Sequence, residues 1–159
     1  MPPIHIALRY GRSVAGGEDT IAAHQAVLAS EGAVLFGKLG RPFGRQTIDK
    51  INAQVSDRTA TYLFLVARIG QELRVHRGRV TGMWKQAPSD AEALIPSYYS
   101  GLGLIEQIGS WFQLSDLRSD NLATAQKLEI AATGTPLLSV LSTSRNSMFL
   151  VSAKRGTRL

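Results

Sequence analysis

Residues 60–83, ATYLFLVARIGQELRVHRGRVTGM, carry the clearest secondary-structure signal in the chain. The first ten of these residues are almost all apolar, which is typical of a strand that is covered on both faces. A Gly-Gln pair then marks a turn, and the residues after it alternate between apolar and basic side chains: Leu73, Arg74, Val75 and His76. The pattern predicts two consecutive strands, the second with one buried and one basic face.

The alternation slips at the Arg-Gly pair 77–78, which predicts a β-bulge there. On either side of this hairpin, the spacing of apolar residues and the turn-forming residues between segments predict further elements. Strands are predicted over 4–10, 33–40, 109–119 and 147–153, and helices over 18–30 and 45–56. Acidic residues open the first helix and Gly32 stands just past its end, while Ile48, Ile51 and Val55 form one stripe on the second.

These elements predict one α+β domain over residues 1–159, with residues 154–159 as a frayed tail or a linker. Five or six strands, two or three flanking helices and glycine-marked corners favour a small, mostly β barrel, since sheet curvature of this kind usually needs glycines and bulges. The chain has 159 residues, of which 44% are hydrophobic and 19% charged, so one domain with a real core is expected.

Composition also limits the class of protein. No apolar run approaches the length of a membrane span, and the N-terminus MPPIHIALRY does not resemble a signal peptide. The absence of cysteine excludes a disulfide framework, a thiolate nucleophile and a cysteine-based zinc site. We therefore expect a cytoplasmic protein that does not act at a membrane. Its net charge of +6 is compatible with a polyanionic partner but does not by itself decide for one.

Motifs of catalysis are weak. Residues 32–39, GAVLFGKL, approach the phosphate-loop pattern, but Leu39 has no hydroxyl for magnesium and the segment is an apolar strand. His5, His24 and His76 are scattered without metal-ligand spacing, and no G-x-S-x-G elbow is present. The sequence therefore predicts no enzyme, no metal and no cofactor.

Aromatic residues fall into two groups. Five lie within apolar strand runs and are expected in the core: Phe36, Tyr62, Phe64, Phe112 and Phe149. Four others lie near glycines, in segments interpreted as loops and strand ends: Trp84, Tyr98, Tyr99 and Trp111. These four either plug the ends of the barrel or form a pocket in which a nucleobase stacks.

Basic residues supply candidate phosphate contacts. One group surrounds the ends of the first two expected strands: Arg9, Arg12, Lys38, Arg41 and Arg45. A second group, Arg74, His76 and Arg79, lies on the basic strand. If these strands are neighbours, the basic groups surround the aromatic residues and hold phosphates.

The order of motifs resembles the PUA-like superfamily, in particular EVE and YTH-type domains and the EVE-like specificity domains of McrB restriction GTPases. The likeness spans roughly residues 4–152 and is carried by short motifs: VLFGKLG (34–40), LRVHRGRV (73–80), IPSYY (95–99), GSWFQLSDL (109–117) and SMFLV (147–151). FGKLG and SWFQL contribute most of it.

The resemblance implies a pseudo-barrel that holds a flipped, modified base in an aromatic cage. It implies that Trp111 belongs to the cage, that Gly37 and Lys38 lie beside it, and that Tyr10 and Ser13 lie at the pocket mouth. Trp84, Tyr98 and Tyr99 are added as base-binding residues from their own sequence setting. The phosphate-binding candidates are Arg9, Arg12, Arg41, Arg45, Arg74 and Arg79.

The expected function is therefore non-catalytic recognition of double-stranded DNA that carries a methylated or hydroxymethylated base. The domain would be the specificity module of a modification-dependent restriction system, with an effector GTPase or nuclease as a partner. A PUA-like domain that reads a modified base in RNA is the main alternative. A small nuclease and a protein-binding module are the others.

Overall fold

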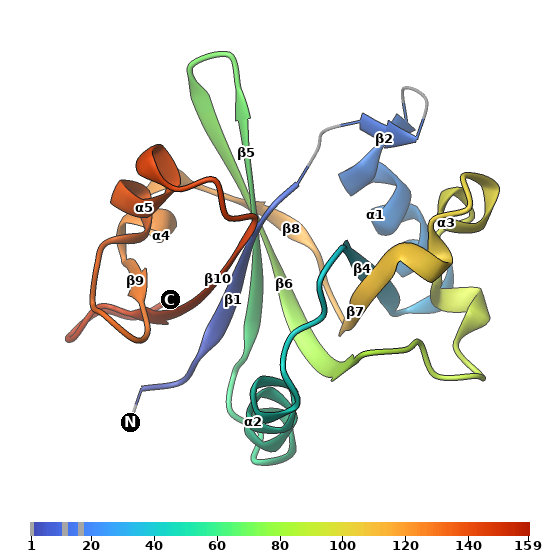
Figure 1. Ribbon diagram of the computed structural model, residues 1–159, viewed down its shortest axis with the longest axis horizontal. Coiled ribbons are helices and arrows are strands. Elements are labelled where there is room, and N and C mark those ends of the chain that lie inside the picture. Colours follow the sequence, from blue (N-terminus) through green and yellow to red (C-terminus); the bar gives the residue numbers. More distant parts are fainter. Residues whose placement is uncertain (1, 11–12, 16–17) are drawn as a thin grey trace.

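The computed structural model describes residues 2–10, 13–15 and 18–159. The strands in this part of the chain are β1 (His5–Arg9), β2 (Ser13–Ala15), β3 (Glu18–Asp19), β4 (Val34–Leu39), β5 (Tyr62–Ile69), β6 (Glu72–Trp84), β7 (Ile108–Leu114), β8 (Arg118–Asp120), β9 (Leu128–Ile130) and β10 (Met148–Ala153). The α-helices are α1 (Thr20–Glu31), α2 (Arg45–Ser56), α3 (Tyr98–Gly101), α4 (Leu122–Gln126) and α5 (Leu137–Thr143) (Figure 1).

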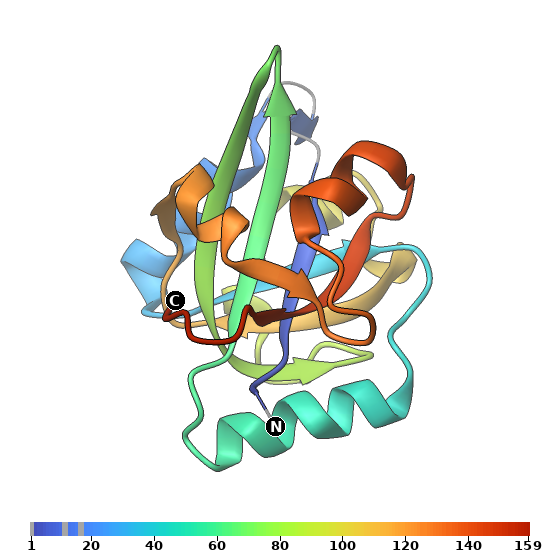
Figure 2. The same cartoon turned by 90° about the vertical axis from the view of Figure 1, so that its left-hand side faces the viewer.

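Eight strands form one open, mixed sheet in the order β4-β7-β6-β5-β1-β10-β9, with β8 paired to β6. The β1–β5 pair is parallel, whereas the other pairs of this sheet are antiparallel. Figure 2 shows β4 and β7 running across the direction of β1 and β5. A mixed α and β fold is thus confirmed, and the sheet is strongly curved.

The hairpin of β5 and β6 forms as predicted, but the predicted bulge at residues 77–78 is wrong. The register runs without a break through the Phe64–Arg77 and Leu63–Gly78 pairs. A Cβ at Gly78 would lie 2.9 Å from Leu114 Cδ1 and 3.0 Å from the Asp116 carbonyl oxygen, so this glycine allows the segment after β7 to approach. The register shift lies further on, between Val80 and Gly82, where β6 pairs with β7.

Two clusters of buried side chains cover opposite faces of the central strands. One lies under α1 and α2 and includes Ile21, Ile48, Ile51, Leu63 and Leu65. The other lies under α4 and α5 and includes Phe64, Val66, Ala125, Leu137 and Leu141. Residues of β5 contribute to both, which confirms that this apolar strand is covered on both faces.

The two early helices are close to their predicted positions. Asp19 is the N-cap of α1 rather than part of its first turn, and its carboxylate accepts hydrogen bonds from the Ile21 and Ala22 amides. Gly32 ends the helix in the left-handed region, with a φ of 79°. Helix α2 has its predicted bounds, and the apolar stripe predicted for it packs into the core under the sheet.

The described residues form ten strands and five α-helices, more than the five or six strands and two or three helices expected from the sequence. Helices α3, α4 and α5 and strands β8 and β9 have three to seven residues each, too few to show a period in the sequence. Residues 154–159, expected as a tail or a linker, contact the domain: the Lys154 amide donates to the Lys127 carbonyl and Leu159 packs against the cluster under α4 and α5.

No helix within the described residues is long and apolar enough to cross a membrane.

Gly109 marks the tightest backbone crossing in β7. A Cβ there would collide with the Gly40 carbonyl oxygen and lie 2.7 Å from the Pro42 nitrogen. Because these backbone atoms belong to a loop that Lys38 and the Gly40–Gln107 hydrogen bond hold in place, Gly109→Ala should lower the free energy of unfolding by roughly 2–3 kcal/mol, as overpacking does. Urea denaturation measures this change. Gly101→Ala is the matched control, since its Cβ would meet nothing within 4 Å; an equal effect of both variants would contradict the steric explanation.

Candidate functional site

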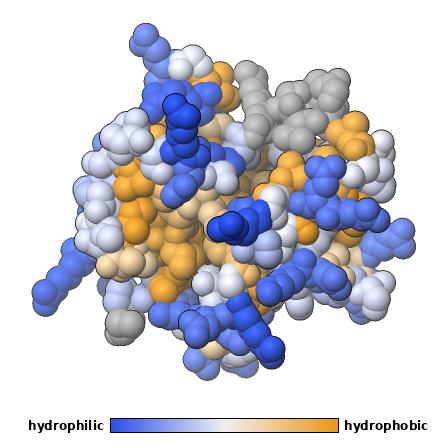
Figure 3. Space-filling view, in the orientation of Figure 1, coloured by the Kyte–Doolittle hydropathy of each residue, from blue (hydrophilic) through white to orange (hydrophobic). Residues whose placement is uncertain are grey.

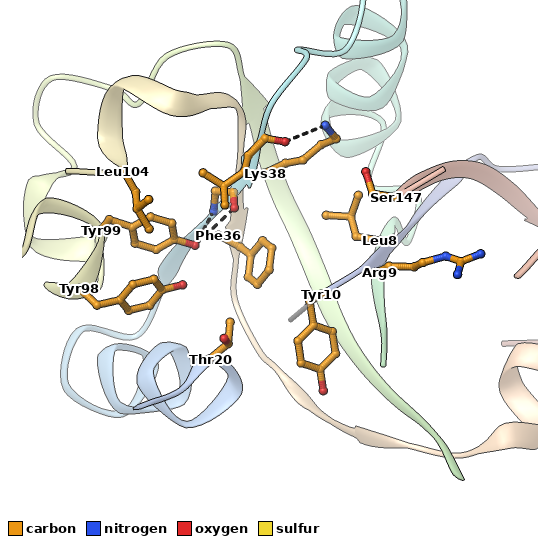
Figure 4. Close-up of a pocket in the computed structure, with 12 residues that line it drawn as sticks. Leu8, Arg9, Tyr10, Thr20, Phe36, Lys38, Tyr98, Tyr99, Leu104 and Ser147 are labelled. Atoms are coloured by element: carbon orange, nitrogen blue, oxygen red, sulfur yellow. Dashed lines mark hydrogen bonds between the residues drawn. The ribbon is translucent and has the colours of Figure 1, made fainter. Parts of the chain in front are cut away.

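The strongest candidate site is a pocket of about 210 Å³ between β1 and β4. The two strands are separated by three others in the strand order of the sheet, yet both line this pocket. The sheet must therefore curve to bring them together. Its lining, which we call the aromatic pocket, consists of Leu8, Arg9, Tyr10, Thr20, Phe36, Gly37, Lys38, Leu39, Tyr98, Tyr99, Leu104 and Ser147 (Figure 4).

Four aromatic side chains form the walls of the pocket. Figure 4 shows Tyr98 and Tyr99 on one side, Tyr10 on the other and Phe36 between them. The Tyr98 and Tyr99 rings stack with their centroids 4.3 Å apart. Aromatic surface contributed from several sides favours a planar guest over a branched one.

Tyr99 is fixed by a buried hydrogen-bond relay. The His24 Nδ1 lies 2.7 Å from the Thr20 carbonyl oxygen, which can only accept, so Nδ1 carries the proton and donates. The other ring nitrogen, Nε2, is therefore the acceptor for the Tyr99 hydroxyl at 3.0 Å. The Tyr99 oxygen in turn accepts the Gly37 amide hydrogen at 2.9 Å. Helix α1, α3 and β4 are thereby locked together behind the pocket.

Both titratable members of the relay are held neutral. Burial lowers the pKa of His24 from 6.5 to about 4, against a smaller opposing effect of its bond to the Thr20 carbonyl. Burial, and secondarily the neighbouring Tyr98, raises the pKa of Tyr99 well above its usual value. The His24 ring also lies 4.6 Å from Phe36, which shields it further. A neutral His24 is what the relay requires.

Trp111 stands directly opposite Gly37 in the β4–β7 ladder, so the two residues that the resemblance pairs are neighbours. The tryptophan is only 2% exposed and packs against Tyr99, with their ring centroids 5.2 Å apart. It lies in the middle of β7 rather than at a strand end. A Cβ at Gly37 would lie 3.0 Å from the Trp111 ring, so the glycine makes room for it. Trp111 therefore supports the wall of the pocket from behind.

Trp84 is half-buried at the end of β6 and folds over Gly82 of its own strand. It packs against the same buried cluster as Trp111. Among the described residues that line the aromatic pocket neither tryptophan appears, whereas Tyr10, Gly37, Lys38, Tyr98 and Tyr99 are brought together there.

Lys38 holds a loop. Its Nζ donates to the carbonyl oxygens of Leu39 and Arg41 at 3.1 and 2.9 Å, and its burial lowers its pKa. The same loop is fixed by the Gly40 amide, which donates to the Gln107 carbonyl at 3.0 Å. The lysine thus positions residues 39–41 beside the pocket mouth.

Arg9 is likewise engaged within the protein. Its guanidinium donates to the carbonyl oxygens of Leu141 and Ser144 at 2.7 and 2.6 Å. These carbonyls belong to the C-terminal end of α5, where a cation is favourable. The side chain therefore anchors α5 to β1, and the phosphate contact predicted for it competes with this role.

The remaining predicted phosphate contacts are dispersed. Arg41 is exposed on the loop after β4, and Arg45 pairs with Asp49 at the exposed start of α2. Arg74 is exposed on β6, 3.8 Å from Glu72, and Arg79 lies 6.0 Å from the Tyr62 ring. Arg12 and the side chain of Ser13 lie outside the described part of the structure.

Tyr10 connects the aromatic pocket to the basic strand. Its hydroxyl lies 3.4 Å from Nδ1 of His76 on β6. A small polar cleft beside this contact is lined by Tyr10, Arg74 and His76, together with Asp19. The basic face of β6 therefore reaches the pocket at one corner. It was expected to surround the pocket only if β6 were a neighbour of β1 and β4, and in the sheet it is not.

Sequence reasoning missed several residues of the site. Phe36 was assigned to the core alone, and His24 was set aside because it had no metal-like spacing. Thr20, Leu104 and Ser147 gave no signal at all, since their places depend on the approach of α1, the 98–107 segment and β10 to the same hollow.

A larger hollow of about 550 Å³ lies elsewhere, over β10 and the segment that precedes β1, near α2, where Figure 3 shows hydrophobic surface. Its lining is mostly aliphatic, with Phe149 as the aromatic residue, Ser152 as a polar one and Lys50 as the charged one. It lacks the grouping of several aromatic rings found in the aromatic pocket. The aromatic pocket is therefore the better candidate.

The described residues contain no group of three or more His, Cys, Asp or Glu side chains that could hold a metal ion. Comparison with protein-family models, with curated proteins and with solved structures finds no match to this chain. The function must therefore be inferred from the site itself.

Proposed function

We propose that this chain is a non-catalytic recognition domain that takes one nucleobase, flipped out of a nucleic acid, into the aromatic pocket. The observation that carries the proposal is the grouping of Tyr10, Phe36 and Tyr98 around a hollow between β1 and β4 in a chain of net charge +6. An aromatic wall accepts the face of any base, and each stacked base contributes about 1–3 kcal/mol.

The size of the pocket supports a single planar guest. Its volume of about 210 Å³ is below the roughly 300–1,000 Å³ typical of sites for drug-sized ligands. Leu8 and Leu104 add aliphatic surface beside the rings. That combination suits a base that carries a methyl or hydroxymethyl group, because the added carbon gains apolar contacts.

Two exposed arginines flank the pocket and are available for phosphates. Arg41 follows the lining residue Leu39 by two positions, and Arg145 precedes the lining residue Ser147 by two. They come from different parts of the chain, since one follows β4 and the other precedes β10. This placement favours phosphates on either side of a flipped nucleotide.

The proposal includes the finer expectations from sequence. The curved sheet is proposed to be a PUA-like pseudo-barrel related to EVE and YTH-type domains. The preferred ligand is double-stranded DNA with a methylated or hydroxymethylated base, in a restriction system with an effector GTPase or nuclease. Modified RNA is the alternative ligand.

Binding of matched oligonucleotides tests the proposal. Tyr10→Ala should weaken binding to the preferred modified duplex roughly tenfold or more, as expected for one lost stacking partner. Fluorescence anisotropy at about 100 mM salt measures this with plain, 5-methylcytosine, 5-hydroxymethylcytosine and N6-methyladenine duplexes and an RNA counterpart, at a salt level where phosphate contacts are not exaggerated.

Tyr62→Ala is the matched control, because Tyr62 is also a half-buried tyrosine but packs on the opposite side of the sheet, with the cluster under α4 and α5. It should leave the affinity within about twofold of that of the unaltered protein. Equal binding of plain and modified duplexes, unchanged by Tyr10→Ala, would refute base recognition. Tighter binding of RNA would reassign the ligand.

A further inference from the structure

Large hydrophobic side chains that are exposed gather beside the aromatic pocket. Among the described residues, four such side chains are exposed by about 36% or more: Leu39 (41%), Leu102 (47%), Ile105 (36%) and Leu122 (47%). Leu122 lies on α4, under the opposite face of the sheet. The other three lie on two segments that meet at the pocket, and we call them the apolar lip.

Backbone pairing brings the two segments of the lip together. Leu39 at the end of β4 stands opposite Ile108, directly after the 3-10 turn η2 (Ile105–Gln107). Leu39 and Leu104 both line the aromatic pocket. Leu104 is the residue before Ile105 and its amide donates to the Tyr99 carbonyl at 2.8 Å. The lip is thus part of the mouth of the pocket.

The lip is held rigidly. Lys38 binds the carbonyls of Leu39 and Arg41, and the Phe43 amide donates to the Ser110 hydroxyl at 3.0 Å. The loop backbone also packs closely on Gly109. These contacts fix the backbone of Leu39 at the pocket mouth, where its side chain is 41% exposed. Apolar surface kept exposed on a fixed loop is typical of a contact with a partner.

We propose that Leu39, supported by Ile105, inserts into the base stack of duplex DNA and fills the gap left by the base in the aromatic pocket. This inference rests on the proposed function. Flipping a base costs stacking and pairing energy, and proteins that distort a duplex often insert an apolar side chain between base steps. Arg41, two residues beyond Leu39, is exposed and would be available to a flanking phosphate.

Such a wedge acts on duplex DNA and has no role on a single strand, whose target base is already unstacked. Leu39→Ser is therefore expected to weaken binding to the modified duplex about tenfold. Because Leu39 also lines the aromatic pocket, binding to a single strand of the same sequence and modification should weaken as well, but by at least about threefold less than binding to the duplex. Both are measured by fluorescence anisotropy.

A mismatched duplex gives a second readout. When the modified base lies opposite a mismatched base, less free energy is needed to unpair it and flip it out. The Leu39→Ser variant should then bind within about threefold of the unaltered protein. A 2-aminopurine probe at the target position should brighten less with the variant than with the unaltered protein on the matched duplex, which reports on flipping rather than on affinity.

Leu122→Ser is the matched control, because Leu122 is as exposed as the lip but lies away from the pocket. It should bind the matched duplex, the mismatched duplex and the single strand like the unaltered protein.

The wedge would be overturned if Leu39→Ser reduced the affinity for duplex and single strand equally, or did not reduce the affinity for duplex. If Tyr10→Ala abolishes the base preference while Leu39→Ser does not affect the duplex, only the wedge fails. If no ligand shows a base preference, or if RNA binds better than duplex DNA, both proposals fail as stated.

Discussion

Acid is expected to destabilise this protein by several kcal/mol between pH 6.5 and about 4. Burial lowers the pKa of both His5 and His24 from 6.5 to about 4, and the charge of Arg77 adds to the effect on His5. Each of these differences corresponds to roughly 3 kcal/mol at 1.36 kcal/mol per pKa unit. Their sum is comparable to the whole stability of a typical domain, about 5–15 kcal/mol.

The sign of the effect follows from proton uptake. Below pH 6.5 the unfolded chain takes up protons on these histidines, whereas the folded chain does so only near pH 4. The stability is therefore complete above pH 6.5 and is lost progressively as the pH falls to about 4. Geometry gives the same direction, because His5 Nδ1 accepts the Tyr62 amide hydrogen at 3.1 Å and His24 Nε2 accepts the Tyr99 hydroxyl. A protonated ring could accept neither.

Urea denaturation at several pH values between about 7 and 4 measures the slope of the unfolding free energy. The variants His5→Gln and His24→Gln should each remove about half of the slope, with some loss of stability at neutral pH. His76→Gln is the comparison: burial lowers the pKa of His76 as well, but this side chain is only half-buried, so its replacement should remove a smaller part of the slope. A slope that survives both substitutions would contradict the assignment.

Trp111→Ala is expected to lower the free energy of unfolding by about 3–5 kcal/mol, as for other buried aromatic residues. The side chain is 2% exposed, contacts Tyr99 and fills the space over Gly37. Its loss leaves a cavity behind the pocket wall, and Tyr99 loses the surface that holds it. Thermal and urea denaturation should show this without any ligand.

Trp84→Ala serves as the comparison, because Trp84 is half-buried at the same buried cluster. Its effect on stability should be clearly smaller. If the Trp111→Ala variant is as stable as the unaltered protein but no longer binds nucleic acid, Trp111 contacts the ligand directly. The assignment of the binding site to the aromatic pocket would then be wrong. Tyr10→Ala is a cleaner test of binding than Trp111→Ala for this reason.

Local sequence patterns determined much of the framework. The hairpin at 60–83 follows from an apolar run, a turn pair and an alternating run, and α2 follows from its stripe of Ile48, Ile51 and Val55. Each of these signals is complete within about a dozen residues. The prediction that Gly37, Lys38 and Trp111 are neighbours came from the resemblance, and the β4–β7 register agrees with it.

The tertiary structure alone decided which aromatic residues face the pocket. Trp111 and Phe36 lie on paired strands, yet Phe36 lines the pocket and Trp111 lies behind Tyr99. The same holds for the cations: Arg9 and Lys38 look like phosphate ligands in sequence, but α5 and the 39–41 loop bring backbone carbonyls to them. Every residue carries a backbone carbonyl group, so a sequence does not show which carbonyls will accept a hydrogen bond from a given cation.

The sequence by itself thus determined where the main strands and the two long helices lie, because period and turn chemistry act between near neighbours in the chain. Only the tertiary structure determined the site. The aromatic pocket and the apolar lip gather Tyr10, Leu39, Tyr99 and Ser147 from four distant segments, and their meeting depends on how far the sheet curves. That curvature is set by the packing of three clusters of side chains together, which no single stretch of sequence encodes.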